Sequence, residues 1–114
     1  MMPLPAVAGP GPGPEAVFTF FLEAGHPAFQ GHFPGDPVLP GVVQVDWAIR
    51  LGTEAFGPLG GFRSLERLKF LEAIRPQETV TLRLVRPRPG ELTFTYLAGA
   101  GKKASGTVRF GAAP

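Results

Sequence analysis

The chain contains no cysteine among its 114 residues. This absence excludes disulfide cross-links, thiolate nucleophiles and most zinc sites, and it fits a cytoplasmic protein. No apolar run approaches the roughly 20 residues that a membrane-spanning helix needs. Residues 1–14 also lack the basic start and apolar centre of a signal peptide. We therefore expect neither a membrane span nor a secretory leader.

An excess of one charge is also missing, because 11 basic residues face 9 acidic ones. Nucleic-acid-binding surfaces are dense basic stripes, whereas the lysines and arginines here are spread through the second half of the chain, so we expect no nucleic acid as a partner. Such a basic half is still suited to an acidic protein partner. The length predicts one domain with a modest core, which a second subunit would help to complete.

Composition divides the chain in two. Residues 1–14 are mostly Pro, Gly and Ala, which predicts a flexible tail, and residues 15–114 form the single domain. Residues 17–22 are rich in Phe and β-branched side chains and predict a strand. Residues 24–40 hold three glycines and four prolines without periodicity, which predicts a long loop. Loops of that length in small domains are usually functional.

The pattern changes at Pro40, which is suited to the first position of a helix. Apolar residues then occupy nearly every face up to Phe56, which predicts a buried helix that ends in the Gly/Pro-rich residues 57–61. The remaining segments 62–71, 79–84, 92–96 and 104–110 alternate as strands, with turn signals at 87–90 and 99–101. The expected fold class is α+β, with one curved antiparallel sheet around one central helix.

Three residues of the loop and helix are suited to acid–base chemistry. His32 can act as a base near neutral pH. Asp46 lies within a helix of aliphatic residues, and desolvation in such surroundings makes a carboxyl a better proton donor. Gly41 lies in the first helical turn, where a backbone N–H has no intrahelical acceptor. A base, an acid and an N–H donor together suffice to eliminate water next to a carbonyl. Each residue taken alone also has a purely structural interpretation, so these patterns leave function open.

The run from His32 to Asp46 resembles the signature of the β-hydroxyacyl-[acyl carrier protein] dehydratases of the FabA/FabZ type, which have the hot-dog fold. That signature is His-Phe, then Gly-x-Pro-φ-φ-Pro-Gly, then an acidic residue fourteen positions after the His. The run 43–48 is most similar to small dehydratases of aryl polyene biosynthesis. The signature positions are occupied by His32, Phe33, Gly35, Pro37, Pro40, Gly41 and Asp46.

The resemblance implies dehydration of a 3-hydroxyacyl thioester to the trans-2-enoyl thioester in fatty-acid or polyene-type lipid biosynthesis, with no metal and no cofactor. His32 and Asp46 are then catalytic, the Gly41 amide binds the thioester carbonyl, and an acyl carrier protein delivers the substrate. The resemblance also implies a homodimer, or a higher oligomer built from it, in which His32 of one subunit faces Asp46 of the other. The supporting turn consists of Phe33, Pro34, Gly35 and Pro40.

Two departures from the family pattern concern the acid and the N-terminus. The position four residues after the acid is usually Gln in the family and is Arg50 here, so Arg50 either pairs with Asp46 or points outward. The usual N-terminal helix and first strand are replaced by the Pro/Gly-rich tail, and we expect a shorter or differently covered acyl tunnel.

Two other functions are compatible with the sequence. One is a hot-dog thioesterase, although thioesterases of this fold generally lack the His-Phe-Pro-Gly turn. The other is a non-catalytic module that binds an acyl group or carrier protein. This second alternative predicts that Arg50 neutralises Asp46 and that the cavity is closed.

Overall fold

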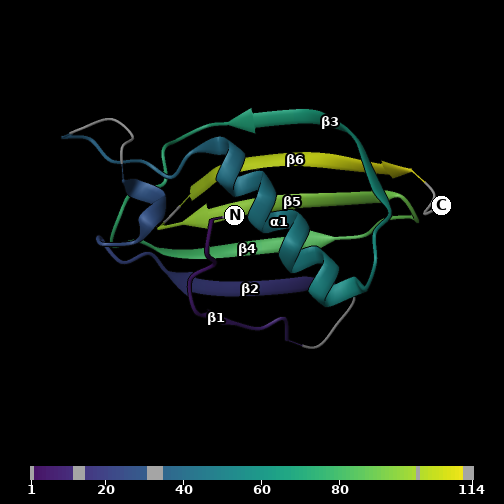
Figure 1. Cartoon of the computed structure of the whole chain (residues 1–114), viewed down its shortest axis with the longest axis horizontal. Helices are drawn as coiled ribbons and strands as arrows, with labels where there is room; N and C mark the ends of the chain where they lie inside the picture. Colours follow the sequence, from purple (N-terminus) through teal and green to yellow (C-terminus); the bar gives the residue numbers. More distant parts are fainter. Residues whose placement is uncertain (1, 12–14, 31–34, 100, 112–114) are drawn as a thin grey trace.

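A computed structural model describes residues 2–11, 15–30, 35–99 and 101–111. Six strands form one curved sheet that wraps around α1, the only α-helix in these ranges (Figure 1). This is the hot-dog arrangement, and it confirms the predicted α+β class. The elements are β1 (Val7–Ala8), β2 (Ala16–Phe21), the 3-10 helix η1 (Pro27–Phe29), α1 (Gly41–Phe56), β3 (Gly61–Phe70), β4 (Thr79–Val85), β5 (Glu91–Ala98) and β6 (Gly101–Gly111).

The strands lie in the order β1-β2-β4-β5-β6-β3, and every neighbouring pair is antiparallel. The segments with turn signals, 87–90 and 99–101, therefore join antiparallel neighbours, β4 to β5 and β5 to β6. β3 is not a neighbour of β4, although it precedes β4 in the sequence, because it lies beyond β6 at the edge of the sheet. One side of β3 is consequently an unpaired sheet edge in the single chain, next to the N-terminal half of α1 (Figure 1).

Period-two alternation places the apolar side chains of the central strands against α1. Leu82 pairs with Tyr96 and Leu84 with Phe94, and all four side chains are fully buried. α1 contributes the other half of the core through Trp47, Ala48 and Leu51, which have no exposed surface. The core thus lies between the concave face of the sheet and one side of the helix.

α1 begins and ends close to the predicted bounds. Pro40 is the N-cap rather than the first helical residue, and Gly57 ends the helix with a φ of 82° that favours glycine. The prediction that the helix is buried on every side was wrong for the single chain, because Val42 is 78% exposed. Among the described residues, no helix is long and apolar enough to cross a membrane.

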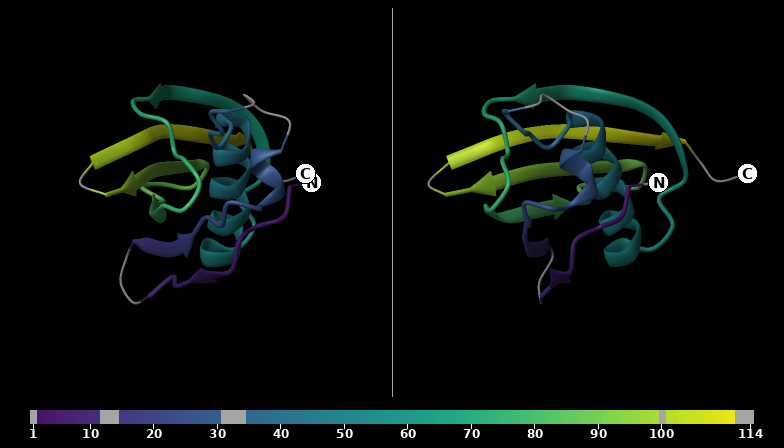
Figure 2. Two further views of the ribbon diagram at one scale, coloured as in Figure 1. Left: turned by 90° about the vertical axis from the view of Figure 1, so that its left-hand side faces the viewer. Right: turned by 60° about the vertical axis from the view of Figure 1, so that its left-hand side comes forward.

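Part of the segment that was predicted to be a tail packs against the domain. Val7 and Ala8 pair with Phe20 and Thr19 of β2, and the Val17 amide donates to the Pro10 carbonyl over 3.0 Å. Figure 2 shows this segment running from the sheet edge to the side of α1 that faces away from the sheet. The domain boundary at residue 15 stays a prediction, but residues 2–11 have contacts that their composition did not predict.

Candidate active site

The turn of the sequence motif is only partly described. His32, Phe33 and Pro34 lie outside the described residues, so their predicted roles remain predictions. Gly35, where the description resumes, has a φ of 86° that favours glycine. Beyond it, Asp36 forms an ion pair with Arg75, and the Leu39 amide donates to the Ile74 carbonyl over 2.7 Å. These contacts hold the end of the loop where it leads into α1.

The first turn of α1 is fixed by Pro40 and Gln44. The amides of Val43 and Gln44 both donate to the Pro40 carbonyl over 3.1 Å, and the buried Gln44 side chain donates to the Leu39 carbonyl over 3.0 Å. The Gly41 amide lies before these hydrogen bonds, at the first residue of the helix. A backbone N–H there has no intrahelical acceptor and can donate to a ligand oxygen. A Cβ atom at Gly41 would lie 2.6 Å from the tip of the half-exposed Phe70 ring, so a side chain here would push that ring away from the helix start.

Asp46 lies on α1 one turn beyond the helix start, but it is not enclosed by aliphatic side chains as the sequence suggested. Its side chain is 38% exposed, and its Oδ2 atom lies 3.2 Å from Nη1 of Arg50. Of the two orientations open to Arg50, the structure has the one that pairs with the acid. The exposure follows from the position of Asp46 on the side of α1 that faces the open groove beside β3.

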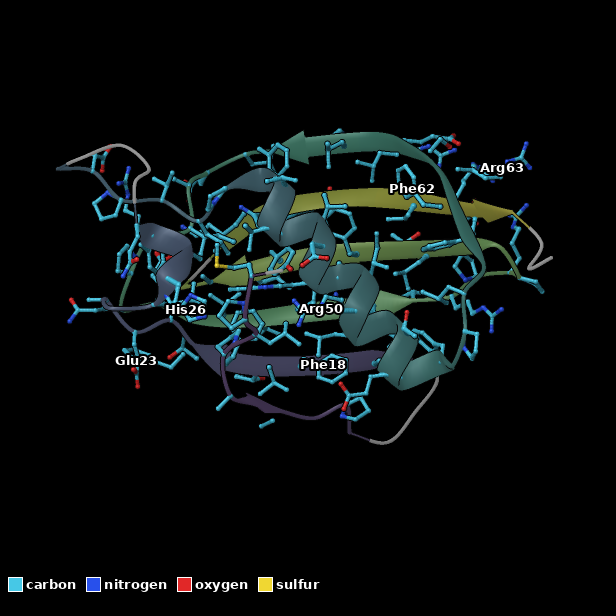
Figure 3. All side chains as sticks on the ribbon, viewed as in Figure 1. Phe18, Glu23, His26, Arg50, Phe62 and Arg63 are labelled. Atoms are coloured by element: carbon cyan, nitrogen blue, oxygen red, sulfur yellow. The ribbon has the colours of Figure 1, made fainter. Side chains whose placement is uncertain are left out.

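Asp46 and Gly41 line the same apolar groove between α1 and β3. The groove has a volume of about 470 Å³ and is open, in contrast to the closed cavity expected for a non-catalytic module. Figure 3 labels Phe62, which lies on β3 at this groove. A chain of methylene groups fits such walls, while the carboxylate and the helix start supply polar groups at one place. The lining residues are Gly41, Val42, Val45, Asp46, Phe62, Leu65, Leu68 and Phe70.

Tyr96 of β5 supports α1 from the concave face of the sheet. Its hydroxyl donates to the Gln44 carbonyl over 2.7 Å, and the side chain is fully buried. Burial raises the pKa of Tyr96 well above its usual value, and the negative charge of Asp46 adds to this effect. The phenol therefore stays neutral and keeps donating its hydrogen bond.

His26 connects the loop to the helix, a role that sequence reasoning missed. Its Nδ1 atom accepts a hydrogen bond from the Ala28 amide over 3.0 Å and so caps η1. Its ring packs edge-to-face on Trp47, with centroids 5.4 Å apart, and Trp47 is the neighbour of Asp46. The only sequence signal is a hydrogen-bond acceptor placed directly before Pro27. Figure 3 shows His26 beside η1 and Arg50 on α1.

Metal ligands do not gather in the described ranges, where no three His, Cys, Asp or Glu side chains come together as a metal site requires. The groups assembled are instead an ion-paired carboxylate, a helix start and an apolar groove. This set is suited to binding an acyl chain and moving a proton beside it.

Comparison with known proteins identifies the family. The model of the ApeI-like family, described as ApeI dehydratase, matches residues 12–107. The chain belongs to the ApeI-like dehydratase family. The matched range spans the segment from His32 to Asp46, and the family assignment confirms the resemblance to this class of dehydratases.

A curated relative agrees with this assignment. The 3-hydroxyacyl-[acyl-carrier-protein] dehydratase FabZ of Chloroflexus aggregans is 35% identical over 88 residues, which are 69% of this chain and 61% of the relative. The chain therefore spans less than two thirds of the length of this relative.

Solved structures give the same fold. A chain of the dehydratase heterocomplex ApeI:P from Xenorhabdus doucetiae superposes with a TM-score of 0.84 at 29% identity, covering 93% of this chain and 96% of that one. Thioesterase superfamily member 2 from Mus musculus superposes with a TM-score of 0.68 at 14% identity, covering 92% of this chain and 82% of that chain. At that identity the thioesterase shares only the fold.

Proposed function

We propose that the protein dehydrates a 3-hydroxyacyl thioester, carried by an acyl carrier protein, to the trans-2-enoyl thioester. The observation that carries this proposal is the open groove of about 470 Å³ that has both Asp46 and the Gly41 helix start in its wall. The groove offers an apolar path for an acyl chain and brings its thioester end to polar groups. Membership of the ApeI-like family supports the same reaction class.

The proposed reaction is an elimination. His32 takes a proton from C2 of the substrate, and the electron pair of that C–H bond forms the new double bond. The Gly41 amide donates to the thioester oxygen, on which negative charge develops. Asp46 must carry a proton in this step, and it gives that proton to the C3 hydroxyl, which leaves as water. The proton that His32 took returns through solvent to Asp46, so the cycle has no net change in protonation. The thioester itself stays intact, so the carrier protein remains attached to the product.

We propose that the working unit is a homodimer in which His32 of one subunit faces Asp46 of the other. The unpaired edge of β3 and the exposed apolar residues beside it support this arrangement. Phe62 and Phe70 on β3 are 58% and 50% exposed, and Val42 on α1 is 78% exposed. Leu65→Lys places a charge on this face and should shift the protein from dimer to monomer in light scattering. A dimer that persists unchanged would contradict the proposed interface.

A non-catalytic binding module remains a second candidate because of one observation. Asp46 is paired with Arg50 at 3.2 Å, as that alternative predicts for a neutralised acid. The open groove argues against it. No contact of the described residues favours the thioesterase, whose support is a shared fold.

The test follows the product. The protein is incubated with 3-hydroxyacyl thioesters of several chain lengths on carrier protein, and conjugated enoyl product is measured together with free thiol. Wild type should form enoyl product, and His32→Ala and Asp46→Asn should abolish it. Glu54→Gln, which neutralises an exposed carboxylate on the same helix, is the matched control and should keep full activity. Thiol release without enoyl product would indicate the thioesterase, and binding without turnover the module.

A further inference from the structure

Arg50 joins the candidate acid to the N-terminal segment. Its Nη1 atom donates to the Met2 carbonyl over 2.6 Å and lies 3.2 Å from Oδ2 of Asp46. One guanidinium nitrogen carries two N–H groups, so it can serve both acceptors at once. The Arg50 side chain is 26% exposed, which places this contact largely out of solvent.

The Met2 carbonyl is held where it is by its neighbours. Met2, Leu4 and Val7 pack against the hydrophobic core, and Val7–Ala8 is paired with β2. We call residues 2–8 the strap. It runs from the edge of the sheet to the outer side of α1 (Figure 2), so a single hydrogen bond at its end reaches the middle of the helix.

The position requires arginine for geometric reasons. A glutamine at position 50 would be two bonds shorter and uncharged, so it could not pair with Asp46 and reach the strap together. The planar guanidinium presents its donors in fixed directions, and fixing one of them on a carbonyl fixes the others. The carboxylate of Asp46 is thereby held by a group whose own position depends on the strap.

We propose that Arg50 is a positioning residue through which the docked strap orients the Asp46 carboxylate at the wall of the groove. The part that concerns catalysis rests on the proposed dehydratase function. Three contacts depend on one another: the packing of the strap, the hydrogen bond from Arg50 to the Met2 carbonyl, and the ion pair between Arg50 and Asp46. Loss of any one of them releases the carboxylate from its place and frees the strap.

The test is a double-mutant cycle that combines a substitution at Arg50 with removal of the strap and measures kcat and KM. Arg50→Gln and a chain shortened by its first five residues should each lower kcat by about tenfold with little change in KM, because orientation rather than binding is lost. The doubly altered chain should be no worse than either, since both changes break the same set of contacts. Arg50→Lys, which keeps the charge without the planar fork, should fall between wild type and Arg50→Gln. Independent, multiplying losses would overturn the proposal.

Hydrogen exchange separates this proposal from the proposed reaction. In Arg50→Gln and Asp46→Ala the amides of Leu4, Ala6, Val7 and Ala8 in the strap should exchange about tenfold faster than in wild type, since a charge-assisted contact is lost. Arg63→Gln, an exposed arginine on β3, is the control and should leave the strap protected. If the protein shows this exchange pattern but no turnover, the proposed reaction is refuted and the coupling between Arg50 and the strap still holds. Unchanged exchange in both variants would refute the strap.

Discussion

The hydroxyl of Tyr96 offers a direct test of how α1 is held in place beside the groove. Tyr96→Phe removes one oxygen atom and nothing else. The lost hydrogen bond runs over 2.7 Å to the Gln44 carbonyl, and the site is fully buried. Water cannot replace the lost donor there without moving the core.

The expected cost follows from what remains. The Gln44 carbonyl lies inside α1 and keeps its intrahelical acceptor role, so it is not left wholly without a partner. We therefore expect the cost of one ordinary buried hydrogen bond, about 1–1.5 kcal/mol in the free energy of unfolding. For 114 residues the unfolding entropy gives about 4 °C per kcal/mol, so the melting temperature should fall by roughly 4–6 °C.

The assay compares Tyr96→Phe with Thr95→Val at equal protein concentration. Thr95→Val removes a hydroxyl from the neighbouring residue on the outer face of β5, and it should change stability by less than about 0.5 kcal/mol. Equal melting temperatures for the two variants would refute the assigned hydrogen bond.

The same residue makes a prediction about pH. The pKa of folded Tyr96 is raised above its usual value of 10.0, first by burial and then by the charge of Asp46. The unfolded chain therefore loses its phenol proton first, so this contribution to stability is complete below pH 10 and declines above it. The chain has 1 tyrosine, so phenolate absorbance reports Tyr96 alone. Phenolate that forms near pH 10 while the protein is still folded would contradict the burial argument.

Two further predictions concern the sheet. A Cβ atom at Gly106 would lie 2.8 Å from the ring of the fully buried Phe94, so Gly106→Ala should destabilise the protein by about 1–3 kcal/mol in denaturant unfolding; an unchanged midpoint would show that the ring can move aside. The pKa of Glu72 is lowered by the hydrogen bond and charge of Lys103, so its carboxyl should titrate below 4.5 by NMR and shift back towards that value in Lys103→Met. The stabilising pair is then present above pH 4.5 and lost as the pH falls through the lower value, and an unaltered Glu72 titration in the variant would refute the pairing.

Local signals in the sequence predicted the local structure well. Pro40 and Gly57 fixed the ends of α1 to within one residue, and period-two alternation identified the buried faces of β4 and β5. The position of β3 was not predictable in this way, because its alternation says nothing of which strand it pairs with. The pairing of Val7 and Ala8 with β2 was not predictable for a related reason, since a Pro/Gly-rich composition lowers the expectation of order but does not exclude pairing with an existing edge.

The sequence predicted where Gly41 and Asp46 lie on the helix, but it did not predict the surroundings of these two residues. A motif specifies that Gly41 and Asp46 lie on one helix, since both follow from the start of α1. The contact between Arg50 and Met2 joins residues 48 positions apart, and no periodicity connects them. In the proposed dimer, the exposure of Asp46 would also depend on the second subunit, which no pattern within one chain describes.

The Arg50–Asp46 ion pair should contribute more to stability in the proposed dimer than in the single chain. In the single chain Asp46 is 38% exposed, and a pair so accessible to water contributes little to stability. If a second subunit covers the groove, Asp46 in its wall loses solvent, and removing Arg50 then leaves the carboxylate buried without its partner, at a cost of several kcal/mol. Arg50→Gln should therefore weaken the dimer much more than it destabilises the monomeric Leu65→Lys chain. The position of Asp46 would then depend on both the strap and the dimer. Arg50 orients the Asp46 carboxylate, and the same arginine neutralises that charge once the groove is covered.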